Sequence, residues 1–80
     1  MKTVKLKTNH FPIIIEQDED NIYIVSCPVF KGCHTYGKSI DEAMKNIKEV
    51  IEMCIEENIE NKKKYTNRFI GFRELELKTA

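Results

Sequence analysis

Apolar residues recur at three- and four-residue spacing across residues 39–57, and this periodicity constrains the fold more than any other feature. The apolar positions are Ile40, Ala43, Met44, Ile47, Val50, Ile51, Cys54 and Ile55. This spacing is typical of one face of an α-helix. Ser39 precedes the run, and Glu42 three residues later completes a capping box in which the hydroxyl accepts from the Glu42 amide. The sequence therefore predicts a helix from about Ser39 to Glu57.

Two β-rich runs precede the helix and are joined by a short acidic segment. The first is Phe11–Glu16 and the second is Ile22–Cys27, both rich in β-branched or aromatic residues. Pro12 lacks an amide donor, which places the start of the first run at a sheet edge or just outside the hydrogen-bonded ladder. Residues 17–21 are turn formers (Gln-Asp-Glu-Asp-Asn). The two runs therefore predict an antiparallel hairpin.

A loop that contains Pro28 and two glycines connects the hairpin to the helix. Gly32 and Gly37 bracket the segment Cys33–Tyr36, which is long enough for one short strand. Two further strand signals lie outside this unit. Residues 2–7 alternate between Lys and apolar side chains, which is compatible with an extra N-terminal strand, and residues 69–77 predict a closing strand with a bulge at Gly71. The expected fold is α+β, an antiparallel sheet of three to five strands packed on one helix in β-β-β-α-β order.

Composition limits the class of protein. Eighty residues predict one domain spanning residues 1–80, with its core in residues 11–57. Thirteen basic and thirteen acidic residues cancel, so net charge gives no attraction toward nucleic acid or an anionic membrane. The chain has no long apolar run and an odd number of cysteines, three, which favours a cytoplasmic location. A core this small predicts stabilisation by at least a dimer.

The ordered set of these segments resembles HicB-like antitoxins. The resemblance is carried by the acidic hairpin, the loop Cys27–Cys33 (CPVFKGC), the step Tyr36-Gly37-Lys38 and the helix start Ser39–Ala43 (SIDEA). It covers roughly residues 13–55. It implies a β-β-β-α-β unit like an abbreviated ribonuclease H sheet. Relatives often carry a C-terminal DNA-binding module, but only about twenty residues follow the helix here, so no separate DNA-binding domain and no direct DNA binding are expected.

The resemblance implies that the protein binds and silences a small, basic HicA-type ribonuclease that cleaves messenger RNA. The protein would act by masking the toxin's active site, as a homodimer or tetramer, without a cofactor and without catalysis. Two alternatives remain open. One is a metal-dependent nuclease that uses the ribonuclease-H-like sheet, and the other is an orphan scaffold that has no toxin.

Several residues suggest chemistry, and each has a simpler interpretation. Three adjacent carboxylates at Asp18, Glu19 and Asp20 suggest a two-metal site, but neighbours at a hairpin tip do not converge, and Asp favours turns. The spacing of Cys27, Cys33 and His34 lacks the short knuckle of zinc sites. No catalytic or metal-binding residue is therefore assigned. Residues 62–64, three lysines, suggest phosphate contacts, but a charged run after a helix is usually solvated.

The candidate partner-binding residues are acidic or aromatic. If the protein acts as the resemblance implies, the acidic residues are expected to compete with RNA for the basic surface of the toxin. Phe30 lies in a tight loop and is expected to be partly exposed, since such loops run over protein surfaces. The alternative, that the aromatic residues seal the core between sheet and helix, is equally compatible with the sequence. The set consists of Asp18, Glu19, Asp20, Tyr23, Phe30 and Tyr36.

Overall fold

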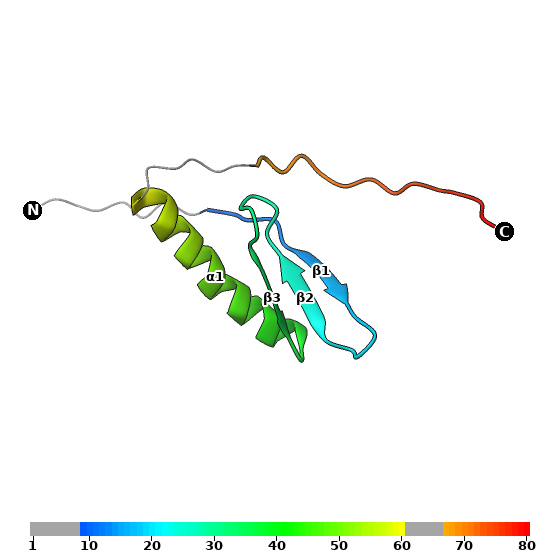
Figure 1. The fold of residues 1–80 in the computed structure, drawn as a ribbon, viewed down its shortest axis with the longest axis horizontal. Coiled ribbons are helices and arrows are strands. Elements are labelled where there is room, and N and C mark those ends of the chain that lie inside the picture. Colours follow the sequence, from blue (N-terminus) through cyan, green and yellow to red (C-terminus); the bar gives the residue numbers. More distant parts are fainter. Residues whose placement is uncertain (1–8, 61–66) are drawn as a thin grey trace, which may run out of the picture.

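Three short strands followed by one long helix make up the folded body of the chain (Figure 1). The computed structural model describes residues 9–60 and 67–80. The strands are β1 (Ile14–Gln17), β2 (Tyr23–Ser26) and β3 (His34–Gly37), and the helix is α1 (Ile40–Glu60). They form an antiparallel sheet in chain order, with β2 in the centre. The predicted α+β fold, with one helix packed on an antiparallel sheet, is confirmed.

A compact turn joins β2 to β3 and carries part of the core. The amide of Cys27 donates to the carbonyl of Cys33 over 2.9 Å, which extends the β2–β3 pairing beyond the strands. The amide of Phe30 donates back to the carbonyl of Cys27 over 3.3 Å. Gly32 adopts a φ of 74°, a left-handed conformation that glycine enters at little cost. The loop therefore folds back onto the sheet.

The helix begins as the sequence predicts and is fixed to one edge of the sheet. The amide of Glu42 donates to the Ser39 hydroxyl over 3.0 Å, so Ser39 caps the first turn. Further along, Asn46 Nδ2 donates to the carbonyl of Tyr36 in β3 over 2.9 Å. The helix lies against β3 and β2 but does not reach β1 (Figure 1). Consequently β1 forms an edge that the helix leaves uncovered.

The core lies between the helix and one face of β2 and the following turn. Val25 is fully buried and faces Ile47 and Ala43 from the helix side, in agreement with the predicted apolar stripe. A side chain of the size of Val25 or Ile47 contributes about 1.5–3 kcal/mol when it is fully removed from water. The buried cluster consists of Val25, Cys27, Phe30, Cys33, Ala43, Ile47 and Ile51.

The predicted closing strand at residues 69–77 is wrong for this structure. Residues 67–80 contain no strand or helix and extend from the body as a tail (Figure 1). A β-strand requires a neighbouring backbone for its hydrogen bonds, and no strand of the described chain pairs with this segment. The alternating segment 2–7 and the lysines at 62–64 lie outside the described residues. Within the described part of the chain, no helix is long and apolar enough to cross a lipid bilayer.

Candidate binding surface

The sheet has one face that no described helix or strand covers. Side chains alternate between the two faces of a strand, and Val25 identifies the face toward the helix. Cross-strand pairing places Ile14 opposite Ser26 and His34, and Glu16 opposite Ile24 and Tyr36. We call this surface the open face. It consists of Ile14, Glu16, Ile24, Ser26, His34 and Tyr36.

The open face combines exposed apolar groups with polar groups at its margins. Tyr36 is 67% exposed and Ile14 is 43% exposed, while Ile24 between the edge strands is half-buried. Glu16 and His34 lie at diagonal corners of this surface and are both exposed. An aromatic ring beside aliphatic side chains, bordered by polar groups, is the composition of a protein-binding patch. The surface is suited to contact with another macromolecule.

The acidic turn between β1 and β2 is organised by Asp18. Its Oδ1 accepts from the amides of Asp20 and Ile22, each over 2.9 Å. Its own amide donates to the carbonyl of Ile22 over 2.9 Å, and Asn21 adopts a φ of 63°. The Asp18 carboxylate is therefore used to shape the turn. Glu19 and Asp20 are exposed at the hairpin tip and present their charges to solvent.

The three aromatic residues predicted to bind a partner occupy different environments. The expected exposure of Phe30 is wrong, because its side chain is 6% exposed. The loop folds inward, and the Phe30 ring packs against Phe11 with centroids 5.7 Å apart. Tyr23 is half-buried on the helix side of the sheet, next to the core. Only Tyr36 of the three lies on the open face, so the structure does not gather the six predicted residues into one patch.

The three cysteines lie close together, two in the loop between β2 and β3 and one on the helix. Cys27 and Cys33 are buried and Cys54 is half-buried, and all three are free thiols. Burial, together with the neighbouring thiol of Cys54, raises the pKa of Cys33 from 9.0 to about 12. Cys33 is therefore protonated at neutral pH and is a poor nucleophile. Among residues 9–60 and 67–80, no group of three or more His, Cys, Asp or Glu side chains is arranged to hold a metal ion.

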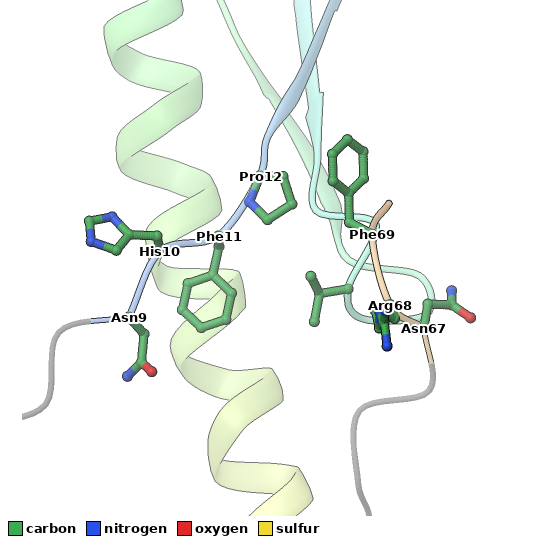
Figure 2. A pocket seen from close by; sticks show the side chains of 8 residues that line it. Asn9, His10, Phe11, Pro12, Asn67, Arg68 and Phe69 are labelled. Carbon is green, nitrogen blue, oxygen red and sulfur yellow. The ribbon is translucent and has the colours of Figure 1, made fainter. Parts of the chain in front are cut away.

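A pocket of about 840 Å³ lies where the tail meets the folded body. It is lined by residues 9–12 on one side, by Val29, and by residues 67–69 on the other side (Figure 2). Figure 2 shows Phe11 and Phe69 on the two sides of this hollow. Phe69 is half-buried here, whereas the residues that follow it are exposed. The pocket therefore lies between the first described residues of the tail and the segment that leads into β1.

Two apolar residues of the open face, Ile14 and Ile24, were not selected from the sequence. Both lie in strands that the sequence correctly predicts, but the sequence alone does not say which side of each strand packs against the helix. The signal that could have identified them is the alternation of side chains along a strand. Ile24 directly precedes Val25, so the two side chains must point to opposite sides of the sheet.

Residues 11–70 match the sequence profile of the HicB-like antitoxin of bacterial toxin–antitoxin systems. The chain belongs to this family. A UPF0150 protein of Archaeoglobus fulgidus is 45% identical over 72 residues, which cover 88% of this chain and 97% of that protein. A UPF0150 protein of Synechocystis sp. is 46% identical over 71 residues, with the same coverage of 88% and 97%.

A solved structure extends this similarity to three dimensions. The N-terminal domain of the Burkholderia pseudomallei antitoxin HicB superposes with a TM-score of 0.60 at 33% sequence identity. The match covers 79% of this HicB-like chain and 68% of the Burkholderia chain. The β-β-β-α arrangement is therefore shared with a known antitoxin domain.

Proposed function

We propose that this HicB-like protein is an antitoxin that binds a small, basic, mRNA-cleaving toxin of the HicA type and masks its active site. The observation that carries the proposal is the similarity of sequence and fold to the N-terminal domain of the antitoxin HicB. The proposed action is binding without catalysis. The protein occupies the surface on which the toxin would otherwise hold RNA.

The open face is the proposed contact surface for the toxin. Tyr36 is its most exposed large side chain and supplies an amphipathic anchor of the kind that dominates binding energy at interfaces. Ile24 lies directly opposite it in β2, and Ile14 lies at the diagonal corner of the same face, so both add apolar surface to the contact. Because the sheet is already folded without the partner, little conformational entropy is lost on binding.

The acidic turn supplies the electrostatic part of the proposed contact. Glu19 and Asp20 are exposed at the tip of the hairpin, and Glu16 extends the negative charge onto the open face. An RNA-cleaving toxin needs a basic surface to hold phosphates, and these carboxylates compete for it. Charges of this kind mainly accelerate association and select the partner.

The test is inhibition of a purified HicA-type toxin by the purified protein. We expect stoichiometric loss of RNA cleavage, and we expect Tyr36→Ala to weaken the inhibition about 30-fold, since an aromatic anchor typically contributes about 2 kcal/mol or more. Met53→Ala is the matched control, because Met53 is 60% exposed on the helix and lies away from the open face. It should inhibit like the unchanged protein.

Two results would contradict the proposal. One is an absence of inhibition by a folded, unchanged protein against toxins encoded beside HicB-like genes. The other is magnesium-dependent RNA cleavage by the protein itself that Asp18→Asn abolishes, which would favour the nuclease instead. If Tyr36→Ala inhibited the toxin as well as Met53→Ala, the antitoxin function would still stand, but the open face would not be the contact surface.

A further inference from the structure

Three thiols converge between the helix and the turn that follows β2, and the proposed antitoxin function uses none of them. Cys27 and Cys33 are 1% and 3% exposed and belong to the buried core. Cys54 is half-buried and packs against that core from the helix. Because Cys54 is distant from the other two in the sequence, it is the packing of the helix that brings the third thiol to this place.

Cys27 and Cys33 face each other at the end of the β2–β3 pairing. The amide of Cys27 donates to the carbonyl of Cys33 over 2.9 Å, and the register that pairs Ser26 with His34 continues to these two residues. Directly opposite residues of an antiparallel pair extend their side chains on the same side of the sheet. Both cysteines therefore lie on the side that packs against the helix.

Cys54 reaches this pair from α1 and is the nearest partner of Cys33. It follows the buried Ile51 by three positions, the spacing of one helical face. The turn and the second half of α1 lie at the same end of the folded body (Figure 1). Burial is the main cause that raises the pKa of Cys33, and the next two are the charge of the Cys54 thiol and a side-chain hydrogen bond with it. The charge of Cys27 has a smaller effect.

We propose that Cys33 and Cys54 form a disulfide when a hydroperoxide oxidises them, and that this bridge locks α1 onto the turn that follows β2. Thiols that are already neighbours in the folded state need little backbone movement to be joined. The bridge closes a loop over residues 33–54, which restricts the unfolded chain and stabilises the folded one. A bridge of this kind in a reducing compartment is transient and senses the redox state.

Cys54 reacts first, because it is the most exposed of the three thiols. Its thiolate attacks one peroxide oxygen, so that an S–O bond forms and the O–O bond breaks. The other oxygen takes the proton that Cys54 released and leaves as water or an alcohol. Cys54 is then a sulfenic acid.

Cys33 resolves this intermediate. Its sulfur attacks the sulfur of Cys54, so that the S–S bond forms and the S–O bond breaks, and the departing hydroxide takes the Cys33 proton and leaves as water. In total, two thiols lose two electrons and two protons, and the peroxide is reduced to water and an alcohol, or to two waters where it is hydrogen peroxide.

Proximity compensates for the low reactivity of Cys33. With a pKa of about 12, roughly one Cys33 thiol in 10⁵ is ionised at neutral pH. Effective concentrations of well-oriented neighbouring groups reach about 10⁵–10⁸ M, which offsets this small fraction. The same protonation keeps Cys33 from reacting with peroxide before Cys54 does.

The test treats the full purified chain, first reduced and then freed of reductant, with hydrogen peroxide. At least one lysine lies between each two successive cysteines, so trypsin releases the three cysteines in three different peptides. We expect one linked pair of peptides, containing Cys33 and Cys54, while Cys27 stays open to alkylation once the chain is unfolded. Dithiothreitol should separate the pair.

The same treatment in concentrated urea is the control for the fold. An unfolded chain closes short loops more readily than long ones, so the bridge between Cys27 and Cys33 should dominate there. A change of partner to Cys54 in the folded protein would show that the packed helix selects the pair. Dominance of the Cys27–Cys33 bridge in the folded protein as well would overturn the proposal.

Stability supplies the second measurement. Peroxide should raise the thermal midpoint of the unchanged protein by on the order of 10 °C, and dithiothreitol should reverse the rise. The midpoint of Cys54→Ala should not respond to peroxide, whereas Cys27→Ala, which keeps both partners, is the matched control and should respond like the unchanged protein. In Cys33→Ala, dimedone should label Cys54 as a sulfenic acid. Circular dichroism of the helix verifies that each variant is folded, and the peptide map of the unchanged chain needs no variant.

Three other results would overturn the proposal. They are three thiols that remain free after peroxide treatment, a bridge that joins two chains instead of closing within one, and an oxidised protein whose midpoint does not rise. None of these measurements involves a toxin, so their outcome is independent of the proposed antitoxin function.

Discussion

A Cβ atom placed on Gly37 would lie 2.5 Å from the amide nitrogen of Ala43, closer than folded proteins allow. Gly37 ends β3 and Ala43 lies in the first turns of the helix, so the helix and sheet approach each other backbone to backbone at this point. The absence of a side chain at Gly37 is therefore what allows the helix to cross the sheet so closely.

Gly37→Ala should destabilise the protein by about 2–3 kcal/mol, since backbone atoms must shift to admit the methyl group. The measurement is urea denaturation followed by the ellipticity of the helix. Gly71→Ala is the control, because a Cβ there would meet nothing within 4 Å. Equal stability of the two variants would contradict the close approach.

Asp18→Ala should lower stability by about 1–2 kcal/mol, because the amides of Asp20 and Ile22 lose the carboxylate that satisfies them. Glu19→Ala should leave the unfolding midpoint unchanged, since Glu19 is exposed at the same turn. Thermal denaturation of both variants tests the difference. A similar loss in both would mean that the turn depends on charge rather than on the Asp18 hydrogen bonds.

Ser39→Ala should cost about 1 kcal/mol, the usual value of a lost N-cap. The Ser39 hydroxyl accepts from the amide of Glu42, and alanine leaves that amide without its partner. Chemical denaturation of Ser39→Ala beside Lys38→Ala, an exposed neighbour outside the helix, provides the comparison. If Lys38→Ala were the more damaging change, the cap would not be the source of stability.

The stability contributed by Cys33 should fall as pH rises. Its pKa is raised from 9.0 to about 12 by burial and by Cys54, so the folded protein holds a proton that the unfolded chain releases above pH 9.0. Cys33→Ala lacks this group. The unfolding free energy of the unchanged protein minus that of Cys33→Ala should therefore be constant below pH 9.0 and should decrease as the pH rises above 9.0. A difference that widens at alkaline pH would contradict the burial of a protonated thiol.

The elements could be predicted from the sequence where local chemistry determines them. The spacing of Ala43, Ile47 and Ile51 specified the helix and its buried face, and Ser39 specified its start. The acidic run at residues 17–21 specified the first turn. These features depend on neighbours within a few residues along the chain, and the structure confirms them.

The candidate site was harder to predict because it depends on contacts between distant residues. Phe30 is buried since its loop folds back against Phe11, a contact that spacing along the chain does not reveal. The segment at residues 69–77 has the composition of a strand, but it pairs with neither edge of its own sheet, and local composition does not determine whether a segment finds a neighbouring strand. Of the three aromatic residues selected from the sequence, Tyr36 is the one whose side chain is exposed, at 67%.

The pairing register assigns the two sides of the sheet to residues of opposite parity. Positions 14, 16, 24, 26, 34 and 36 form the open face, whereas positions 15, 17, 23, 25, 35 and 37 lie on the other side of the sheet, where the helix packs against β2 and β3. Substitutions at the even-numbered positions therefore change the open face, while the odd-numbered positions of β2 and β3 continue to hold the helix. A sheet of three four-residue strands can thus change one of its surfaces by mutation without losing its fold.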